Sequence, residues 1–491
     1  MQLLWWSVSS PWGMLMSALL VALHLAVIVR ALTRPGREAA ARVAWVAVLL
    51  FLPFVGVFAY LMLGETSIGR VRRARMGSAE KSISLPKTQR PSGLDPDTES
   101  AFSLVESING FAATQGNSVR LAADSDAAID ELVADIDAAQ STVHIGFYIW
   151  LADTNGTKVA DAVSRAARRG VTCRILVDAV GSRAFLRSHL WAQMKQAGAT
   201  CVAALQDLPR WGKLAVGRVD LRNHRKITVI DDTIAYCGSQ NCADPAFRVK
   251  PKFAPWVDVF FRCQGPIVAQ EQWLFLTTWR TELPQDTVSV GTPRAWGPSE
   301  GAASMPAHDS VVGAMFGTGP TARPGAMSEA FTTVIAAAHS ELTVSTPYFV
   351  PDEPLLAALC AAPRRGVRTT LVLPQNNDSW FVAQAARSSY RRLLEAGVEL
   401  YEYPLGLLHS KTMTVDGHLA MVGSANMDRR SLELNYENNL LLAHPAATAA
   451  IRERQQSYLD ASSPVSLVTV RGWSLWSRLV QNAVAMLAPI L

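Results

Sequence analysis

A duplicated motif constrains the fold of this chain more than any other feature of its 491 residues. Residues 224–231 and residues 409–416 both read H-x-K-x4-D, and in both copies Gly, Ser and Asn follow the histidine at 14, 15 and 17 positions. One such motif is expected by chance only about 0.01 times in a chain of this composition. Two copies with the same tail therefore indicate an internal repeat.

The repeat extends to the segments that precede the motif. Each half offers an apolar, β-branched segment, then a helical stretch that ends in Arg-Arg-Gly-Val, then a second apolar segment. We expect strands at 141–150 and 173–177 in the first half and at 342–350 and 369–373 in the second. Strands that alternate with helices predict the α/β class. The sequence thus favours two tandem α/β lobes with pseudo-twofold symmetry and a site at their junction.

The motif carries the chemistry of a phosphate site. Side chains two positions apart on a strand point to the same face, so His224 and Lys226 are predicted to face one site, as are His409 and Lys411. Two imidazoles and two ammonium groups around one point would bind phosphate without a metal or another cofactor. We expect one histidine to attack phosphorus as a neutral nucleophile. The other would protonate the leaving alcohol and then deprotonate the incoming one.

The rest of the motif supplies supporting candidates. Asp231 and Asp416 complete the two copies and are grouped with the candidate catalytic residues, although a structural role in fixing the strand or turn is favoured over proton transfer. The Gly-Ser turns are predicted to bring neutral hydrogen-bonding groups to the phosphate. These groups belong to Ser239, Asn241, Ser424 and Asn426.

Two uncharged runs near the amino terminus predict membrane helices. Residues 11–29 and 43–63 each cover roughly 30 Å as a helix, which is the thickness of a bilayer core. We expect a two-helix transmembrane hairpin over residues 1–65. A cleaved signal peptide is disfavoured because no Lys or Arg precedes the first run and a second run follows. Lys and Arg are slightly more numerous after the second run than between the runs, which favours a cytoplasmic catalytic domain.

The remaining chain divides by composition and by the repeat. Residues 66–110 are predicted to be a linker and entry segment that leads into the folded part, because residues 76–110 are rich in Ser, Thr, Pro and Gly. Lobe 1 is expected at 111–300 and lobe 2 at 301–460. Residues 461–491 carry Trp and Leu near helical spacing, which predicts an amphipathic helix on the membrane surface. An ordinary packing helix is the alternative.

Composition narrows the class of partner. Hydrophobic residues make up 49% and charged residues 18% of the chain, which agrees with membrane segments and excludes wholesale disorder. The net charge of +5 suits an anionic partner, either phospholipid headgroups or nucleic acid. The six cysteines form no C-x-x-C pair, so neither a zinc site nor a disulfide framework is expected.

The segments around the motifs resemble the phospholipase D superfamily and, within it, the bacterial cardiolipin synthases. Residues 220–226 with the tail at 238–241 resemble the first motif of that family, and residues 423–431 with 435–437 resemble the tail of the second. Residues 346–352 resemble a strand of its second lobe. The likeness covers nearly the whole chain. It implies a fold of two phospholipase D-like lobes that build a single site.

The resemblance also implies roles for particular side chains. His224 corresponds to the nucleophile and His409 to the general acid and base, with the reverse assignment left open by the near symmetry of the motifs. An acidic residue after each motif would orient the histidine of the other motif. Glu437 matches this position well, and Asp258 matches it more loosely.

The resulting hypothesis is cardiolipin synthesis. Two phosphatidylglycerols would give cardiolipin and glycerol through a phosphatidyl-histidine, with no cofactor and no metal. The expected partners are phosphatidylglycerol and a bilayer with anionic lipids, without nucleic acid, at the bacterial inner membrane as a multi-pass protein. The oligomeric state is left open. Alternatives are a phospholipase D that produces phosphatidic acid, a membrane-tethered phosphodiesterase or nuclease, and a lipid-binding protein without catalysis.

Overall fold

The computed structural model describes residues 11–35, 39–65, 68–86, 90–206, 218, 220–286 and 310–487. The described chain divides into two compact units, and the chain passes from unit 1 to unit 2 between Gly69 and Arg70. The predicted lobe boundary at 300 and 301 lies outside the described residues. The domain limits given above stay predictions.

Unit 2 is built on one sheet of 15 strands, with β1 (Thr114–Leu121) and β9 (Val311–Thr318) adjacent at its middle. Outward from β1, lobe 1 adds β8 (Phe260–Gln264), β6 (Ile234–Gly238), β5 (Ile227–Ile230), β2 (Thr142–Phe147), β3 (Thr172–Asp178) and β4 (Thr200–Ala204). Outward from β9, lobe 2 adds β18 (Glu437–Ala443), β16 (Leu419–Gly423), β15 (Thr412–Val415), β10 (Glu341–Ser345), β12 (Arg368–Pro374), β13 (Glu399–Tyr403) and β19 (Ser463–Pro464).

The two lobes repeat the same topology. β2 and β10 each pair in parallel with the next strand, β3 or β12, and antiparallel with the motif strand, β5 or β15. At the middle, β1 and β9 pair antiparallel, as a twofold relation requires. The predicted α/β fold of two repeated lobes is confirmed. The sequence did not indicate that both lobes share one sheet.

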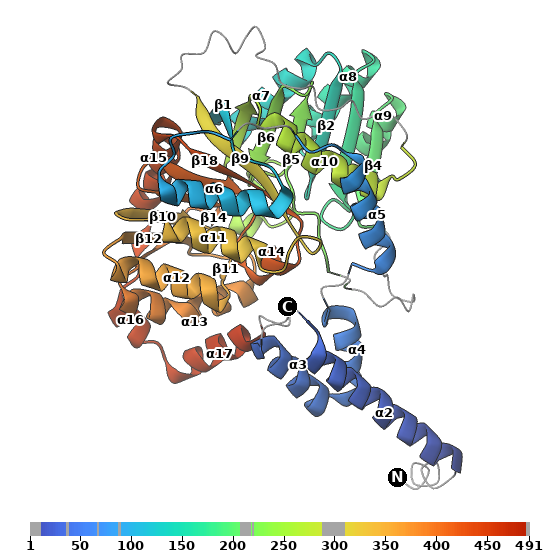
Figure 1. Cartoon of the computed structure of the whole chain (residues 1–491), viewed down its shortest axis with the longest axis vertical. Coiled ribbons are helices and arrows are strands. Elements are labelled where there is room, and N and C mark those ends of the chain that lie inside the picture. Colours follow the sequence, from blue (N-terminus) through green and yellow to red (C-terminus); the bar gives the residue numbers. More distant parts are fainter. Residues whose placement is uncertain are drawn as a thin grey trace. The chain divides into compact units, whose positions relative to one another are not determined.

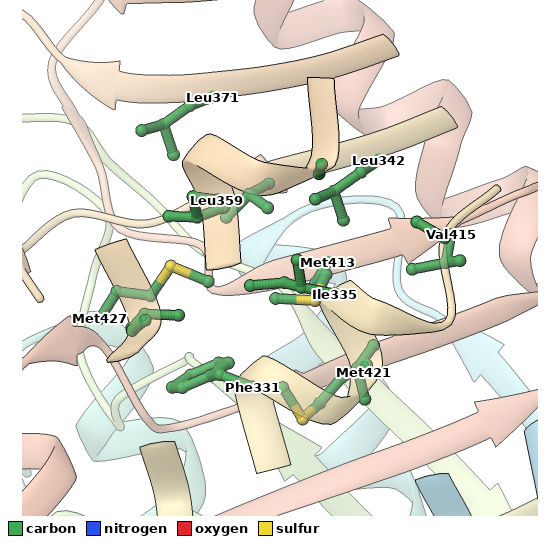
Figure 2. Packing of buried hydrophobic residues seen from close by; sticks show 14 of the residues in the cluster. Phe331, Ile335, Leu342, Leu359, Leu371, Met413, Val415, Met421 and Met427 are labelled. Atoms are coloured by element: carbon green, nitrogen blue, oxygen red, sulfur yellow. The ribbon is translucent and has the colours of Figure 1, made fainter. Parts of the chain in front are cut away.

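Helices cover both faces of the sheet. Lobe 1 carries α7 (Ser125–Ala138), α8 (Thr154–Arg168) and α9 (His189–Gln196), and lobe 2 carries α11 (Ala326–Ala336), α12 (Glu353–Arg364) and α13 (Trp380–Ala396). In lobe 2, Phe331 and Ile335 of α11 pack with Met413 and Met421 of the sheet (Figure 2). Gln455 of α15 (Pro445–Asp460) bonds to threonines that alternate with these apolar residues, so α15 lies on the opposite face.

The predicted linker contains two helices, α5 (Arg70–Ser82) and α6 (Pro96–Asn109), which its composition did not indicate. α6 buries Thr98, Ala101, Phe102 and Val105, a spacing that gives one helical face. α6 lies beside α11, which lies beside α12 (Figure 1). Its signals are local: Asp95 caps the first turn, Pro96 follows, and Gly110 ends the helix with a φ of 79°. The high Ser and Thr content masked this short apolar face.

The carboxyl-terminal segment holds α16 (Leu467–Arg471) and α17 (Leu475–Leu487). Leu475, Trp476 and Leu479 of α17 are exposed, so the helix presents an apolar surface to its surroundings. Contact of this surface with a membrane stays a prediction.

Unit 1 contains one helix that is long and apolar enough to cross a membrane, among the residues that the structure describes. This helix is α2 (Pro11–Thr33), with 23 residues and a mean hydropathy of 2.2. The predicted continuous span at 43–63 is wrong, because the run splits into α3 (Ala39–Phe51) and α4 (Pro53–Leu63) at Leu52. Pro53 cannot donate a helical hydrogen bond and disfavours helix at the residue before it. The protein is therefore membrane-associated through an apolar amino-terminal region.

Candidate active site

Backbone pairing between the lobes positions His409. The motif follows β14 (Leu407–Leu408), which pairs in parallel with β7 (Trp256–Val257) of lobe 1. The amide of His409 donates to the carbonyl oxygen of Val257 at 2.8 Å. Asp258 comes next on the lobe 1 strand, and its Oδ1 lies 2.6 Å from Nδ1 of His409.

The same arrangement is repeated around His224. Asn223 forms a parallel bridge with Tyr436 of lobe 2, and the amide of His224 donates to the carbonyl oxygen of Tyr436 at 2.9 Å. Glu437 follows Tyr436, and its carboxylate oxygens lie 2.8 and 3.0 Å from Nδ1 of His224. Each motif histidine thus meets a carboxylate from the opposite lobe. The structure brings Asp258 to this position although its sequence match is the looser one.

The motif serines lie behind these carboxylates. Ser239 Oγ donates to Oδ1 of Asp258 at 2.5 Å, and Ser424 Oγ donates to Oε2 of Glu437. Ser431 Oγ also donates to Glu437, at 2.8 Å. The serines were predicted to serve the phosphate, whereas in the structure they fix the carboxylates that hold the histidines. All of these side chains are buried.

The motif asparagines are buried beside the same turns. Asn241 Oδ1 accepts from the amide of Ile149 at 3.3 Å, and Nδ2 of Asn426 donates to Ser431 Oγ at 3.3 Å. Among the described residues, Oδ1 of Asn426 has no hydrogen-bond partner. The predicted phosphate-binding role of the asparagines stays a prediction.

Both motif lysines are buried next to their own histidines. Lys226 Nζ donates to the carbonyl oxygen of His224 at 2.7 Å, and Lys411 Nζ donates to that of His409 at 2.5 Å. Burial lowers the pKa of Lys226 to about 8. Burial also lowers the pKa of Lys411 to about 7, and the charge of Lys226 acts in the same direction. In such a poorly solvated site, a protonated lysine would hold an anion strongly.

Both motif histidines are neutral near pH 7. Burial lowers the pKa of both His224 and His409 to about 4, against the opposite effect of their carboxylates. Burial alone would raise the pKa of Asp258 and Glu437, but the adjacent imidazoles and lysines bring both below their ordinary values. An ionised carboxylate only accepts, so Nδ1 carries the proton in each ring and Nε2 keeps its lone pair.

The two half-sites lie within electrostatic reach of each other. The charge of Lys411 contributes to the lowered pKa of His224, and the charge of Lys226 contributes to that of His409. Such contributions are expected when charged groups share one poorly solvated region. This coupling is what a single site built from both lobes requires.

Asp231 and Asp416 lie away from the histidines, which corrects their grouping with the catalytic candidates. Each directly follows the motif strand, β5 or β15, roughly 16 Å along the chain from the lysine that precedes the strand. Both adopt the left-handed backbone conformation, with φ of 51° and 49°. Each carboxylate accepts three backbone amides at 2.7–2.8 Å, from Gln140, Ser141 and Thr142 for Asp231 and from His339, Ser340 and Glu341 for Asp416. They fix the loop before the first strand of each half, in agreement with the structural role that was favoured over proton transfer.

Three aromatic residues of the site were not predicted. Tyr148 lies edge-on to His224 with ring centroids 5.0 Å apart, and Tyr348 lies edge-on to His409 at 6.3 Å. Trp256 lies 4.6 Å from His409. Each tyrosine follows the first strand of its half, β2 or β10, within three residues of the end of the strand.

The two half-sites differ at the second position of the motif. Arg225 is buried and its Nε donates to the carbonyl oxygen of Glu437 at 3.1 Å. The corresponding residue of the second motif, Ser410, instead lies 3.0 Å from Ser345 within its own lobe. Asn438 adds a second link between the lobes, because its side chain bonds to both the amide and the carbonyl of Lys226.

Among the described residues, no group of three or more His, Cys, Asp and Glu side chains is arranged to hold a metal ion. The six cysteines form no disulfide, and five of them are buried.

The chain is similar to known proteins. Residues 132–251 and 331–458 match the family model described as "Cardiolipin synthase, PLD-like domain". Cardiolipin synthase A of Klebsiella pneumoniae (strain 342) is 34% identical over 467 residues, covering 93% of this chain and 94% of that protein. The chain belongs to the cardiolipin synthases of the phospholipase D superfamily. The predicted family and the predicted phosphatidyltransferase type of enzyme are thereby confirmed.

Other comparisons agree with this membership. Cardiolipin synthase A of Escherichia fergusonii is 35% identical over 467 residues, with the same coverage of both chains. Residues 22–65 match a model described as "Phospholipase_D-nuclease N-terminal". The crystal structure of phosphatidylserine synthase from Haemophilus influenzae Rd KW20 has a TM-score of 0.56 at 14% identity and covers 80% of this chain and 100% of its own, which shows a shared fold.

Proposed function

We propose that this cardiolipin synthase transfers a phosphatidyl group from one phosphatidylglycerol to the glycerol hydroxyl of another. The observation that carries the proposal is the crossed pair of contacts, in which each motif histidine is held through Nδ1 by a carboxylate from the other lobe. Both Nε2 atoms are then available for chemistry at one phosphorus.

The first half of the reaction forms a phosphatidyl-histidine. Nε2 of His224 attacks phosphorus, and the bond between phosphorus and the glycerol oxygen breaks. The anionic diester raises the pKa of His409, which protonates the departing glycerol. Lys226 and Lys411 balance the negative charge on the phosphoryl oxygens.

The second half returns the site to its starting state. His409, now neutral, takes the proton from the hydroxyl of the second phosphatidylglycerol, and that oxygen attacks phosphorus. The bond between phosphorus and His224 breaks, and cardiolipin leaves. One diester is consumed for each diester formed, so the exchange needs no nucleotide.

Several features support this assignment of partners and place. The relatives named above are cardiolipin synthases, and the solved neighbour is a phosphatidylserine synthase, so phospholipids are the substrate class. Phosphatidylglycerol as both donor and acceptor is the proposed choice. The enzyme would act at the bacterial inner membrane, with unit 2 on the cytoplasmic side, where Arg70, Arg73 and Arg75 follow the apolar region.

Product analysis tests the proposal. Purified enzyme in vesicles receives phosphatidylglycerol labelled in the terminal glycerol and in the acyl chains. We expect cardiolipin and free glycerol in equal amounts, without added nucleotide. Phosphatidic acid as the main lipid product would instead assign hydrolysis, and the absence of both products would reject phosphatidyl transfer from this lipid.

A further inference from the structure

The second apolar run of unit 1 folds as a hairpin of two short helices. α3 has 13 residues and α4 has 11, which correspond to about 20 and 16 Å of helix. A bilayer core is about 30 Å thick, so neither helix crosses it alone. The chain reverses at Leu52, where φ is −131° and ψ is 66°.

Contacts along the hairpin show that α4 returns alongside α3. A Cβ atom on Gly56 would lie 2.7 Å from the carbonyl oxygen of Val48, so the two backbones approach as closely as glycine allows. Farther from the turn, the rings of Trp45 and Tyr60 meet edge to face with centroids 5.2 Å apart. Both rings are buried. Val48 lies beside Gly56 near the turn, and Trp45 lies beside Tyr60 farther from it. This order is that of an antiparallel pair of helices.

An ion pair marks where the hairpin ends. Nη2 of Arg30, in the last turn of α2, lies 2.9 Å from Oε2 of Glu65, and Nη1 of Arg34 lies 3.5 Å from the same oxygen. Glu65 follows α4 directly. A continuous helix over 39–65 would carry Glu65 roughly 39 Å from its start, beyond the reach of any arginine at the end of α2. The end of α4 therefore lies near the carboxyl-terminal end of α2, which is also where α3 begins.

The turn of the hairpin is apolar and uncovered. Phe51 is 84% exposed and Phe54 is 76% exposed, and Leu50, Leu52 and Val55 beside them are exposed as well. No charged residue occurs from 43 to 63. Exposed aromatic and aliphatic side chains without any charge suit hydrocarbon rather than water. The neighbouring helix α2 has the same surface over a length that spans a bilayer.

We propose that α3 and α4 form a re-entrant hairpin, which enters the hydrocarbon of the bilayer from the side at which α2 ends and returns to that side. The apolar surface of the hairpin would then contact the acyl chains of the lipid. α2 is then the single span of unit 1, and the start of unit 2 lies on the side opposite to the amino-terminal end of α2. A two-span hairpin would place both on the same side. This proposal does not depend on the reaction that unit 2 catalyses.

Cysteine accessibility in the full-length chain tests the proposal without any need to know the absolute orientation. Ser10→Cys lies next to the start of α2, Thr33→Cys at its end, and Ser78→Cys on an exposed position of α5. Each variant is placed in sealed vesicles and treated with a membrane-impermeant maleimide before and after detergent. The unsubstituted chain measures the background from the native cysteines, of which five are buried.

The pattern of three positions decides the topology. We expect the reagent to label Thr33→Cys and Ser78→Cys from one side and Ser10→Cys from the other. Labelling of Ser10→Cys and Ser78→Cys from the same side, with Thr33→Cys opposite, would establish two spans and overturn the proposal. Labelling of all three from one side would overturn it as well, because α2 would not cross. Cardiolipin synthesis by each variant is measured separately, so a failure of catalysis leaves the topology readout intact.

Discussion

At the scale of single residues, each histidine depends on a side chain that the other lobe supplies. Glu437 orients His224 and Asp258 orients His409, and a motif serine donates to each carboxylate. The carboxylates fix the tautomer that leaves Nε2 reactive. Neither histidine has this environment within its own lobe, so a correctly joined pair of lobes is a condition for the chemistry.

Removal of the orienting charge should lower the rate without preventing lipid binding. For Glu437→Gln and Asp258→Asn we expect kcat to fall about a hundredfold or more while KM changes little, because a neutral amide favours the wrong tautomer. Steady-state kinetics on phosphatidylglycerol vesicles provide the measurement. Ser424→Ala, which keeps the carboxylate, is the matched control and should lose much less. Equal losses in Glu437→Gln and Ser424→Ala would contradict the tautomer argument.

The nucleophile can be identified with an activated substrate. A p-nitrophenyl phosphodiester of a diacylglycerol has a leaving group that needs no general acid. His409→Ala should then form a covalent adduct on His224, whereas His224→Ala should form none. Mass spectrometry of peptides after rapid quenching reports the modified residue. An adduct on His409 in the His224→Ala enzyme would reverse the proposed roles.

The lysines set the alkaline limit of activity. Their pKa values of about 7 for Lys411 and about 8 for Lys226 mean that the positive charges are lost as pH rises through this range. We expect kcat/KM to fall from about pH 7 upward, and kcat to fall only at higher pH, because bound phosphate favours protonated lysine. Rate profiles measured from about pH 5 to about pH 10 check this order. An alkaline limb that is identical in both profiles would exclude the lysines as its source.

At the scale of elements, the aspartates of the motif build turns rather than chemistry. Asp231 and Asp416 each tie three backbone amides of the preceding half to the end of the motif strand. The spacing that both copies of the motif share thus places reactive residues before the strand and an anchoring aspartate after it.

Substitution of Asp231 should therefore affect stability more than catalysis. We expect Asp231→Ala to lower the free energy of unfolding by about 1–3 kcal/mol, because three backbone amides of the preceding loop lose their charged acceptor. Asp231→Asn is the matched control, since asparagine tolerates the left-handed backbone and keeps one acceptor oxygen. Denaturant unfolding gives the difference, and kcat/KM of folded protein should stay within about threefold. A loss of kcat at unchanged stability would return Asp231 to the catalytic group.

The sequence pattern predicted the helices and strands that occur in both halves. It did not predict features that depend on contacts between residues far apart in the chain. The strands before each motif follow from local periodicity. The break at Leu52 had a local signal in Pro53, but its consequence, a returning helix, depends on the packing of Gly56 against Val48. The position of Asp258 depends on pairing between β7 and β14, which lie about 150 residues apart in the chain.

At the scale of the whole unit 2, one sheet carries both lobes. β1 and β9 join the halves, and the two crossed strand pairs near the motifs join them again at the site. Two copies of a motif predict two half-sites, but only the strand pairing between the lobes combines them into one site. The contact between the lobes also depends on residues such as Asn438 and Arg225, which the motif pattern does not single out.

The number of lipids held covalently per chain tests this account most directly. Without an alcohol acceptor, the activated p-nitrophenyl phosphodiester should release a rapid burst of one p-nitrophenolate per chain, because both lobes form one site with one nucleophile. Active-site titration by stopped-flow absorbance gives the amplitude. A burst of two per chain would show two independent sites and contradict the central claim.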